Sequence, residues 1–197
     1  MGKSHSLLSN LKWAVSIGIV SFFIAVFMSV ISETILRHAS IAIAFCVLVV
    51  IILIGVLFDA VGIAVAASTE KAFHSMAANR VKGAGTAVKV VRNASAVSSI
   101  CNDVIGDICG IISGAASAII IAQIAVTYDI KDATIMSISL SGIVAALTIG
   151  GKALGKEFGI KKSDLIVFEF AKLLYLIESV SGVELLKIKK NARKKKG

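Results

Sequence analysis

Three aspartates lie inside long apolar stretches of this sequence, and their carboxylates are the groups best placed to do chemistry. Asp59 belongs to the apolar run 41–67, whereas Asp103 and Asp107 belong to the run 96–126. A carboxylate in hydrocarbon is costly, so it normally faces a helix bundle or a wet cavity and marks an ion path or a proton relay. We therefore take these aspartates as candidates for a cation site.

The three carboxylates are expected at similar depths in two neighbouring helices. Asp59 lies eight residues before Ala67, the end of its apolar run, which is about 12 Å along a helix. Asp103 lies seven residues after Ala96, the start of its run, and Asp107 follows one turn later on the same helix face. The spacing therefore predicts that the three carboxylates converge on one site.

Further oxygen donors lie close to these aspartates in the sequence. They come from Ser98, Ser99 and Asn102 in the later run, and from Ser68 and Thr69 just after the earlier one. Hard cations such as magnesium prefer carboxylate, amide and backbone carbonyl oxygens and water. The donor set therefore favours magnesium or sodium. In the alternative interpretation, the same groups form hydrogen bonds between helices and the acids are protonated.

Glycine recurs at every fourth position in the later run, at Gly106, Gly110 and Gly114. Such a row of small residues predicts that another helix packs closely against it. Gly106 is the neighbour of Asp107 in the sequence, so its backbone carbonyl would lie beside an ion site. We therefore include Gly106 among the candidate metal ligands.

The segments that carry these residues are long enough to cross a membrane. The chain has 197 residues, of which 57% are hydrophobic and 17% charged, and it contains no proline. A span of the hydrocarbon needs roughly 20 apolar residues. Four runs are near or above this length, which predicts an all-α integral membrane protein with four transmembrane helices: 13–31, 41–67, 96–126 and 133–151.

The first run also has the charged start of a signal peptide. It is long for a signal-peptide core, and no convincing small-residue cleavage site precedes the segment that begins at Ser32. We therefore expect the first run to be retained as a membrane helix.

Lys and Arg residues are concentrated in three of the segments that connect or flank these runs. They are frequent in 1–12, in 68–95 and from residue 152 onward, and scarce in the two remaining connections. Basic residues near span ends are retained in the cytoplasm. The sequence therefore predicts a multi-pass plasma-membrane protein with cytoplasmic N- and C-termini, and this topology explains the net charge of +9.

The basic C-terminal run 187–197 has no interleaved aromatic residues. We interpret it as a cytoplasmic tail held against anionic membrane lipid, with no nucleic-acid partner. Before it, Ser163 is expected to cap a helix with Asp164 in its first turn. The charges on this segment argue against a fifth span, so we expect a juxtamembrane helix that lies on the membrane or packs on a partner.

The sequence gives no indication of an enzyme. His5, His38 and His74 are scattered in polar segments, the three cysteines fall inside predicted spans, and no phosphate-binding loop or zinc-ligand spacing is present. A thiol inside a span usually behaves as a small hydrophobic group. We therefore expect a transport or binding function without catalysis.

Three short motifs resemble those of the membrane domain of the cyclin-M/CorC magnesium transporter family. The first is the family's Ser-Glu-x-Ala-Leu-x-Ser signature, in which Glu70, Ala72 and Ser75 match and Thr69 replaces the first serine. In this family the signature closes the first span of the membrane domain. The resemblance covers roughly residues 41–178, in the same order and spacing.

The other two motifs are more degenerate. Asn102 keeps the first asparagine of the family's Gly-Asn-x-Leu-Val-Asn motif, with Cys101 in place of the glycine and Gly106 in place of the second asparagine. Gly151 begins a segment similar to the family's Gly-Glu-x-x-Pro-Lys motif, but Lys152 stands where the family has glutamate. A negative group has thus become positive, and Lys152 is expected to neutralise Asp59 or Asp103.

The resemblance implies a three-span core with juxtamembrane helices, usually dimeric, that transports magnesium by exchange with sodium or regulates such transport. It implies cation ligands from Ser68, Thr69, Asn102 and nearby backbone, with Asp103 and Asp107 as extra acids. The chain ends without the nucleotide-binding CBS pair and terminal domain of typical members. We therefore divide it into an additional span with its loop (1–40), a CorC-like membrane domain (41–178) and a basic tail (179–197).

Two functional hypotheses follow from these observations. In the first, the protein transports a divalent cation, magnesium before others, with sodium as a coupling ion. Asp59 and the donors named above then hold the cation, whereas Lys152 and Glu70 modulate the charge of the site. In the second, the protein is a non-transporting membrane scaffold or regulatory subunit of the same fold. A homodimer and a cytoplasmic protein partner bound through the tail are the expected assemblies.

Overall fold

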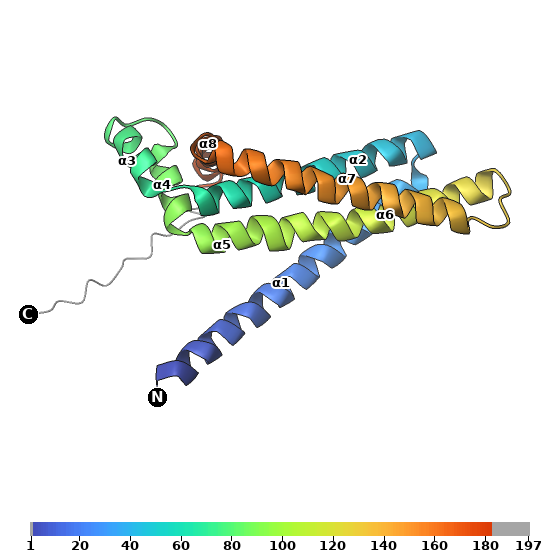
Figure 1. Ribbon diagram of the computed structural model, residues 1–197, viewed down its shortest axis with the longest axis horizontal. Helices are drawn as coiled ribbons and strands as arrows, with labels where there is room; N and C mark the ends of the chain where they lie inside the picture. Colours follow the sequence, from blue (N-terminus) through green and yellow to red (C-terminus); the bar gives the residue numbers. More distant parts are fainter. Residues whose placement is uncertain (1, 183–197) are drawn as a thin grey trace, which may run out of the picture. The chain divides into compact units, whose positions relative to one another are not determined.

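The computed structural model describes residues 2–182, with side chains from residue 15 onward, and every regular element in this range is a helix (Figure 1). Most of the predicted basic tail lies outside the described residues. The elements are α1 (Gly2–His38), α2 (Ile41–Ala67), α3 (Glu70–Ala78), α4 (Ala84–Arg92), α5 (Ala94–Ser99), η1 (Ile100–Gly106), α6 (Asp107–Thr127), α7 (Thr134–Lys161) and α8 (Ser163–Ser181).

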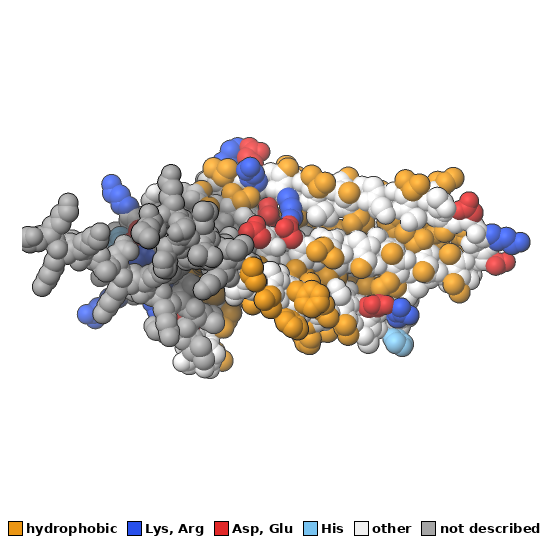
Figure 2. Space-filling model, turned by 90° about the horizontal axis from the view of Figure 1, so that it is seen from below, with side chains coloured by type: hydrophobic (Ala, Val, Ile, Leu, Met, Phe, Trp, Pro, Cys, Tyr) orange, Lys and Arg blue, Asp and Glu red, His pale blue; other side chains and the backbone are white. Residues whose placement is uncertain are grey.

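Four helical stretches are long and apolar enough to span a membrane, as the sequence predicts. They are Val15–His38, Ile41–Ala67, Ala94–Thr127 and Thr134–Lys161. The third stretch is continuous through α5, η1 and α6. The fourth continues beyond residue 151, the predicted end of its apolar run, into a charged segment. Figure 2 shows hydrophobic side chains spread along the long helices on the face in view.

The described chain forms two compact units, and each contains part of α2 and part of α7. The first unit comprises residues 1–55 and 107–150, and the second comprises 56–106 and 151–197. Each unit therefore contains segments that are far apart in the sequence.

In the first unit, α1 packs against α6. Leu36 at the end of α1 is fully buried, as are Ala116 and Ile120 on α6, which lie four residues apart on one face. The side-chain amide nitrogen Nε2 of Gln123 donates a hydrogen bond of 2.8 Å to the backbone carbonyl of Leu36. The contact between the two helices thus combines apolar packing with one amide hydrogen bond.

In the second unit, three short helices cover the end of α2. Phe73 of α3, Val90 of α4 and Val167 of α8 are buried together with Val65 of α2. Full burial of a side chain such as Phe73 stabilises the fold by roughly 1.5–3 kcal/mol. The helix predicted after Ser163 is therefore present as α8, and it packs on α4 of its own chain. The predicted cap is wrong: Ser163 is the first residue of α8, and Lys162 is at the N-cap position.

The turn before α4 requires glycine. Gly83 has φ +85°, a left-handed conformation that residues with a Cβ rarely adopt. A Cβ there would also lie 3.1 Å from Cγ of Lys172 on α8. This turn therefore allows α4 and α8 to pack closely.

A row of glycines on α7 contacts α2. A Cβ at Gly151 would lie 2.7 Å from Cγ2 of Val56, and one at Gly159 would lie 2.7 Å from the backbone oxygen of Ala60. Gly155, between them, is in ordinary contact range of the same two α2 residues. Small residues at every fourth position thus allow the two backbones to approach, as is common between membrane helices.

Unlike the glycines of α7 that contact α2, most of the glycine row on the third span, which the sequence predicted to pack closely, has no neighbouring helix among the described residues. Gly106 is buried against neighbouring atoms, but a Cβ at Gly110 or Gly114 would meet nothing within 4 Å in the part of the chain that the structure describes. These two glycines therefore do not bring helices together within this chain. The sequence pattern does not distinguish them from the glycines of α7, because the spacing is the same in both helices.

We expect Gly159→Ala to lower the thermal unfolding temperature of the detergent-solubilised protein. The new Cβ collides with α2 backbone, and overpacking of this kind costs about 1–3 kcal/mol. Gly150→Ala is the matched control on the same helix, because a Cβ there meets nothing within 4 Å and gains up to about 1 kcal/mol of helix propensity. Equal unfolding temperatures for the two variants would contradict the close α2–α7 contact.

Candidate functional site

An ion pair lies inside two of the candidate membrane spans. The ammonium Nζ of Lys152 on α7 is 3.9 Å from Oδ1 of Asp59 on α2. The two side chains are only 24% and 15% exposed, respectively. A charge inside an apolar helix is retained when it pairs with an opposite charge. Lys152 therefore neutralises Asp59, one of the two aspartates for which the sequence predicted this role.

Gly106 of η1 lies next to both members of this ion pair. A Cβ on Gly106 would lie 3.6 Å from Nζ of Lys152 and 3.7 Å from Oδ1 of Asp59. It would also lie 3.3 Å from the backbone oxygen of Cys101. The bare backbone of η1 therefore faces both charges, and a longer side chain at this position would crowd them.

Asn102 lies one turn before Gly106 and contacts the same helix. A Cβ on Gly62 of α2 would lie 1.9 Å from Oδ1 of Asn102, so the amide occupies the space that a side chain at residue 62 would fill. Nδ2 of Asn102 is 3.5 Å from Oγ of Ser98. Oδ1 is buried, and among the described residues it has no hydrogen-bond partner.

The two pairs of contacts fix the register of α2 against η1. Asp59 lies beside Gly106, and Gly62 lies beside Asn102. Residue numbers rise on one segment as they fall on the other, so the segments run antiparallel, as consecutive membrane spans do. Asp59 and Gly62 are separated by about 4.5 Å along α2. The carboxylate of Asp59 and the buried amide of Asn102 therefore lie about one helical turn apart along α2, within one site.

The segment that carries Asn102 and Gly106 is a π-helix, Ile100–Gly106. A π-helix has hydrogen bonds between residues five apart, is rare, and often occurs at functional sites. Asn102 and Gly106 are four residues apart and so lie on nearly one face of the segment, where both contact α2. The sequence contains no motif from which we could predict this turn, because the seven residues also fit an ordinary α-helix.

Asp103 and Asp107 are exposed on the described structure. Asp103 lies within η1, whereas Asp107 begins α6 and belongs to the first unit. The residues that the second unit brings together are instead Asp59, Gly106 and Lys152, with Asn102 one turn away. No group of three or more His, Cys, Asp and Glu side chains suited to a metal ion occurs among the described residues.

Ser68 and Thr69 lie further along the chain, between α2 and α3. Oγ of Ser68 is buried and has no hydrogen-bond partner among the described residues, whereas Thr69 is exposed at the start of α3. Ser68 is nine residues beyond Asp59, or about 13 Å along a helix. Ligands lie 2.0–2.6 Å from a magnesium or calcium ion. One cation therefore cannot bind Asp59 and Ser68 together.

Glu70 joins two short helices, α3 and α4. Its Oε2 accepts a hydrogen bond of 2.8 Å from Nε of Arg92 on α4 and lies 3.3 Å from Nε2 of His74. The hydrogen bond from Arg92 is the main cause that lowers the pKa of Glu70 below its ordinary value of 4.5. This contact stabilises the fold at pH above that value, and the contribution is lost as pH falls through the lowered pKa.

No protein-family model, curated protein or solved structure matches this chain. The similarity to the cyclin-M/CorC membrane domain therefore stays a prediction from three short motifs. The segment that corresponds to the third motif begins on the face of α7 that contacts α2, because Gly151 and Gly155 both lie against that helix. Lys152, the residue that departs from the family pattern, is the one that reaches Asp59.

We expect Gly62→Ala to destabilise the protein by about 1–3 kcal/mol, because the new Cβ overlaps the side chain of Asn102. All three atoms nearest to that Cβ belong to Asn102. The loss should therefore disappear when Gly62→Ala is made in an Asn102→Ala background. A double-mutant cycle of thermal or denaturant unfolding measures this coupling. Additive effects of the two substitutions would show that Asn102 does not lie on Gly62.

Proposed function

We propose that this protein transports a cation across the plasma membrane, with magnesium as the substrate and sodium as the coupling ion. The observation that supports this proposal is the position of Asp59. Its carboxylate lies inside a candidate span, beside the bare backbone at Gly106. About one helical turn away is Oδ1 of Asn102, which is buried and has no hydrogen-bond partner among the described residues. Carboxylate, amide and backbone oxygens are the donors that magnesium and sodium prefer.

The unpartnered amide oxygen has an energetic consequence. A buried acceptor without a hydrogen bond costs about 1–3 kcal/mol. Oδ1 of Asn102 is in this state, and Gly62 leaves the space that the amide occupies. Coordination of a cation would offset the cost, because the oxygen would then have an electropositive partner. Binding of the proposed substrate would thus remove the free-energy cost of this unpaired amide oxygen.

Lys152 competes with the substrate for Asp59. Its ammonium lies 3.9 Å from the carboxylate, so a cation must displace it before it binds there. Lysine is suited to this role because its charge sits on a flexible four-carbon stem. The proposed transport cycle therefore alternates between a state in which Lys152 neutralises Asp59 and a state in which the cation does.

The remaining features are proposed from the charge distribution. Both termini lie in the cytoplasm, because the basic segments at the start of α1, between α2 and α5, and from residue 152 onward fall on one side of four spans. The basic tail is attracted to anionic membrane lipid. We also propose a homodimer, and a cytoplasmic protein partner that binds through the tail.

Transport can be measured with the purified protein in liposomes that contain a magnesium-sensitive dye. We expect Asp59→Asn and Asn102→Ala each to reduce magnesium flux roughly tenfold or more, because a lost contact to a charged group is worth about 1.5–3 kcal/mol. Asp129→Asn is the matched control. Asp129 has φ +49° in the connection between α6 and α7, and asparagine tolerates that conformation well. Equal flux in all three variants would contradict the proposed site.

A second function is favoured by one observation, the ion pair itself. If Lys152 occupies the cation position permanently, the protein is a non-transporting scaffold or regulatory subunit. Its polar site then only fixes α2 against α7, and its role depends on a protein partner. This hypothesis predicts that the wild-type protein gives no flux while remaining folded.

Lys152→Gln separates the two functions. In a transporter, removing the competing ammonium should lower the magnesium concentration at half-maximal flux several-fold, while a scaffold should show no flux with or without the substitution. Lys156→Gln is the matched control, since Lys156 lies one turn later on α7 and is exposed. A transporting protein whose half-saturation is unchanged by Lys152→Gln would contradict competition at Asp59. Thermal unfolding of each variant shows that it is folded.

A further inference from the structure

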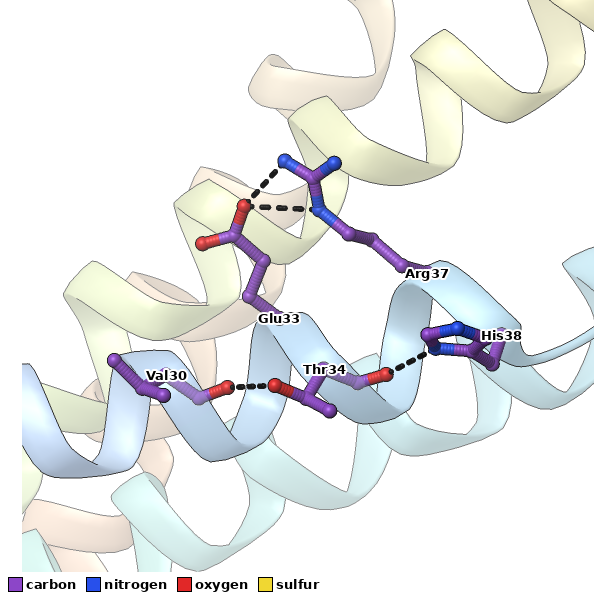
Figure 3. Close-up of polar contacts among 5 residues, drawn as sticks. All are labelled: Val30, Glu33, Thr34, Arg37 and His38. Carbon is purple, nitrogen blue, oxygen red and sulfur yellow. Dashed lines mark hydrogen bonds and ion pairs between the residues drawn. The ribbon is translucent and has the colours of Figure 1, made fainter.

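Most of the charged side chains in the four candidate spans have a polar partner in their own chain. On α1, Nε and Nη2 of Arg37 donate hydrogen bonds of 3.0 and 2.6 Å to Oε1 of Glu33 (Figure 3). On α7, Nζ of Lys161 lies 2.6 Å from Oε1 of Glu157. The ion pair described above joins α2 to α7, and Asp107 also has a polar partner. The exceptions are therefore informative.

The two exceptions are Asp103 on η1 and Lys156 on α7. Both side chains are exposed, and neither has a hydrogen-bond or ion-pair partner among the described residues. A charge in a membrane span is costly, so it normally pairs with another charge or faces a wet cavity. These two charges are opposite in sign, and both belong to the second unit.

The two charges lie at nearly the same level of the second unit. The glycine row of α7 contacts α2 with residue numbers that rise together, so α7 runs parallel to α2, whereas η1 runs antiparallel to it. The two segments that carry the charges are thus antiparallel to each other, and Nζ of Lys152 lies beside Gly106 between them. Lys156 follows Lys152 by four residues and Asp103 precedes Gly106 by three. Both charges are therefore displaced in the same direction from this contact, by about 6 and 5 Å.

Both charges also lie on the exposed surface beside this contact. Lys156 is one turn from Lys152 on the same face of α7, which is the side of that helix that reaches η1. Ile100 and Asp103 are the exposed residues of η1, and Ile160, one turn beyond Lys156, is 52% exposed. We call this surface the η1–α7 face; it consists of Ile100, Asp103, Lys156 and Ile160. It carries one carboxylate, one ammonium and apolar side chains.

We propose that a second copy of this chain packs on the η1–α7 face, with Asp103 of each copy paired to Lys156 of the other. A dimer with a twofold axis makes each of its contacts twice. An axis along the membrane normal keeps every residue at its own depth, so that charges at nearly one level meet across it. This single contact therefore neutralises both charges in both copies.

The pair of opposite charges selects the second copy over other occupants. The phosphate of a lipid headgroup would neutralise Lys156 and leave Asp103 unpaired. A different protein would need an ammonium and a carboxylate of its own at matching positions, whereas a second copy has them by symmetry. The inference rests on the homodimer of the proposed function and assigns its interface.

Charge reversal tests this interface in liposomes. Full-length copies that carry either a donor or an acceptor fluorophore are reconstituted together, and energy transfer between them is measured as the protein is diluted with lipid. We expect Asp103→Lys and Lys156→Asp each to weaken self-association roughly tenfold or more, because each homodimer then holds two pairs of like charges.

A mixture of the two variants separates pairing between copies from pairing within one chain. A copy with Asp103→Lys beside a copy with Lys156→Asp again has two pairs of opposite charges, so we expect the mixture to associate as the wild type does. If the two charges interacted only within one chain, each variant would keep its own like charges and mixing would restore nothing.

Lys162→Asp is the matched control, because Lys162 is exposed in the same unit and lies outside the η1–α7 face. It is at the N-cap position of α8, where aspartate is favourable. This variant should associate as the wild type does. Thermal unfolding of each variant shows that it is folded.

Three results would overturn the proposal. A monomeric wild type would contradict the homodimer itself, whereas a wild-type dimer that both charge reversals leave intact would contradict only this interface. Failure of the mixture to associate would show that the two charges do not pair between copies. Neither charge takes part in the ion pair at Asp59, so magnesium flux tests the cation site separately.

Discussion

The structure of the second unit depends on the cost of a charge inside an apolar helix. Asp59 and Lys152 lie in different candidate spans, so their pairing requires α2 and α7 to be close. The backbone of α7 approaches α2 through the glycine row 151, 155 and 159, which contacts Val56 and Ala60. The glycines and the ion pair are therefore parts of one arrangement, since a bulkier α7 surface would hold the ammonium away from the carboxylate.

The same constraint explains the contact between α2 and η1. Gly106 leaves room for both charges, and Gly62 leaves room for the amide of Asn102. Each helix thus contributes one glycine and one polar side chain to the interface. Asn102 and Gly106 are four residues apart and share one face of η1, so that the two contacts form at the same time.

The sequence predicted the four long apolar helices, because they depend on composition along the chain. It did not predict that Asp103 and Asp107 would be exposed while Gly106 lies beside Asp59. That outcome depends on helix register and on the π-turn, which neither charge nor hydrophobicity encodes locally. The packing of α8 on α4 and the open surroundings of Gly110 likewise arise from tertiary contacts between distant segments.

The charge of Lys152 restricts which exchanges at Asp59 are favourable. A monovalent cation that replaces the ammonium conserves the neutral charge of the site, whereas magnesium adds one further positive charge. Magnesium binding therefore requires the ammonium to withdraw from the apolar region altogether. The flexible stem of lysine allows its charge to move toward the membrane surface while its methylene groups stay in apolar surroundings.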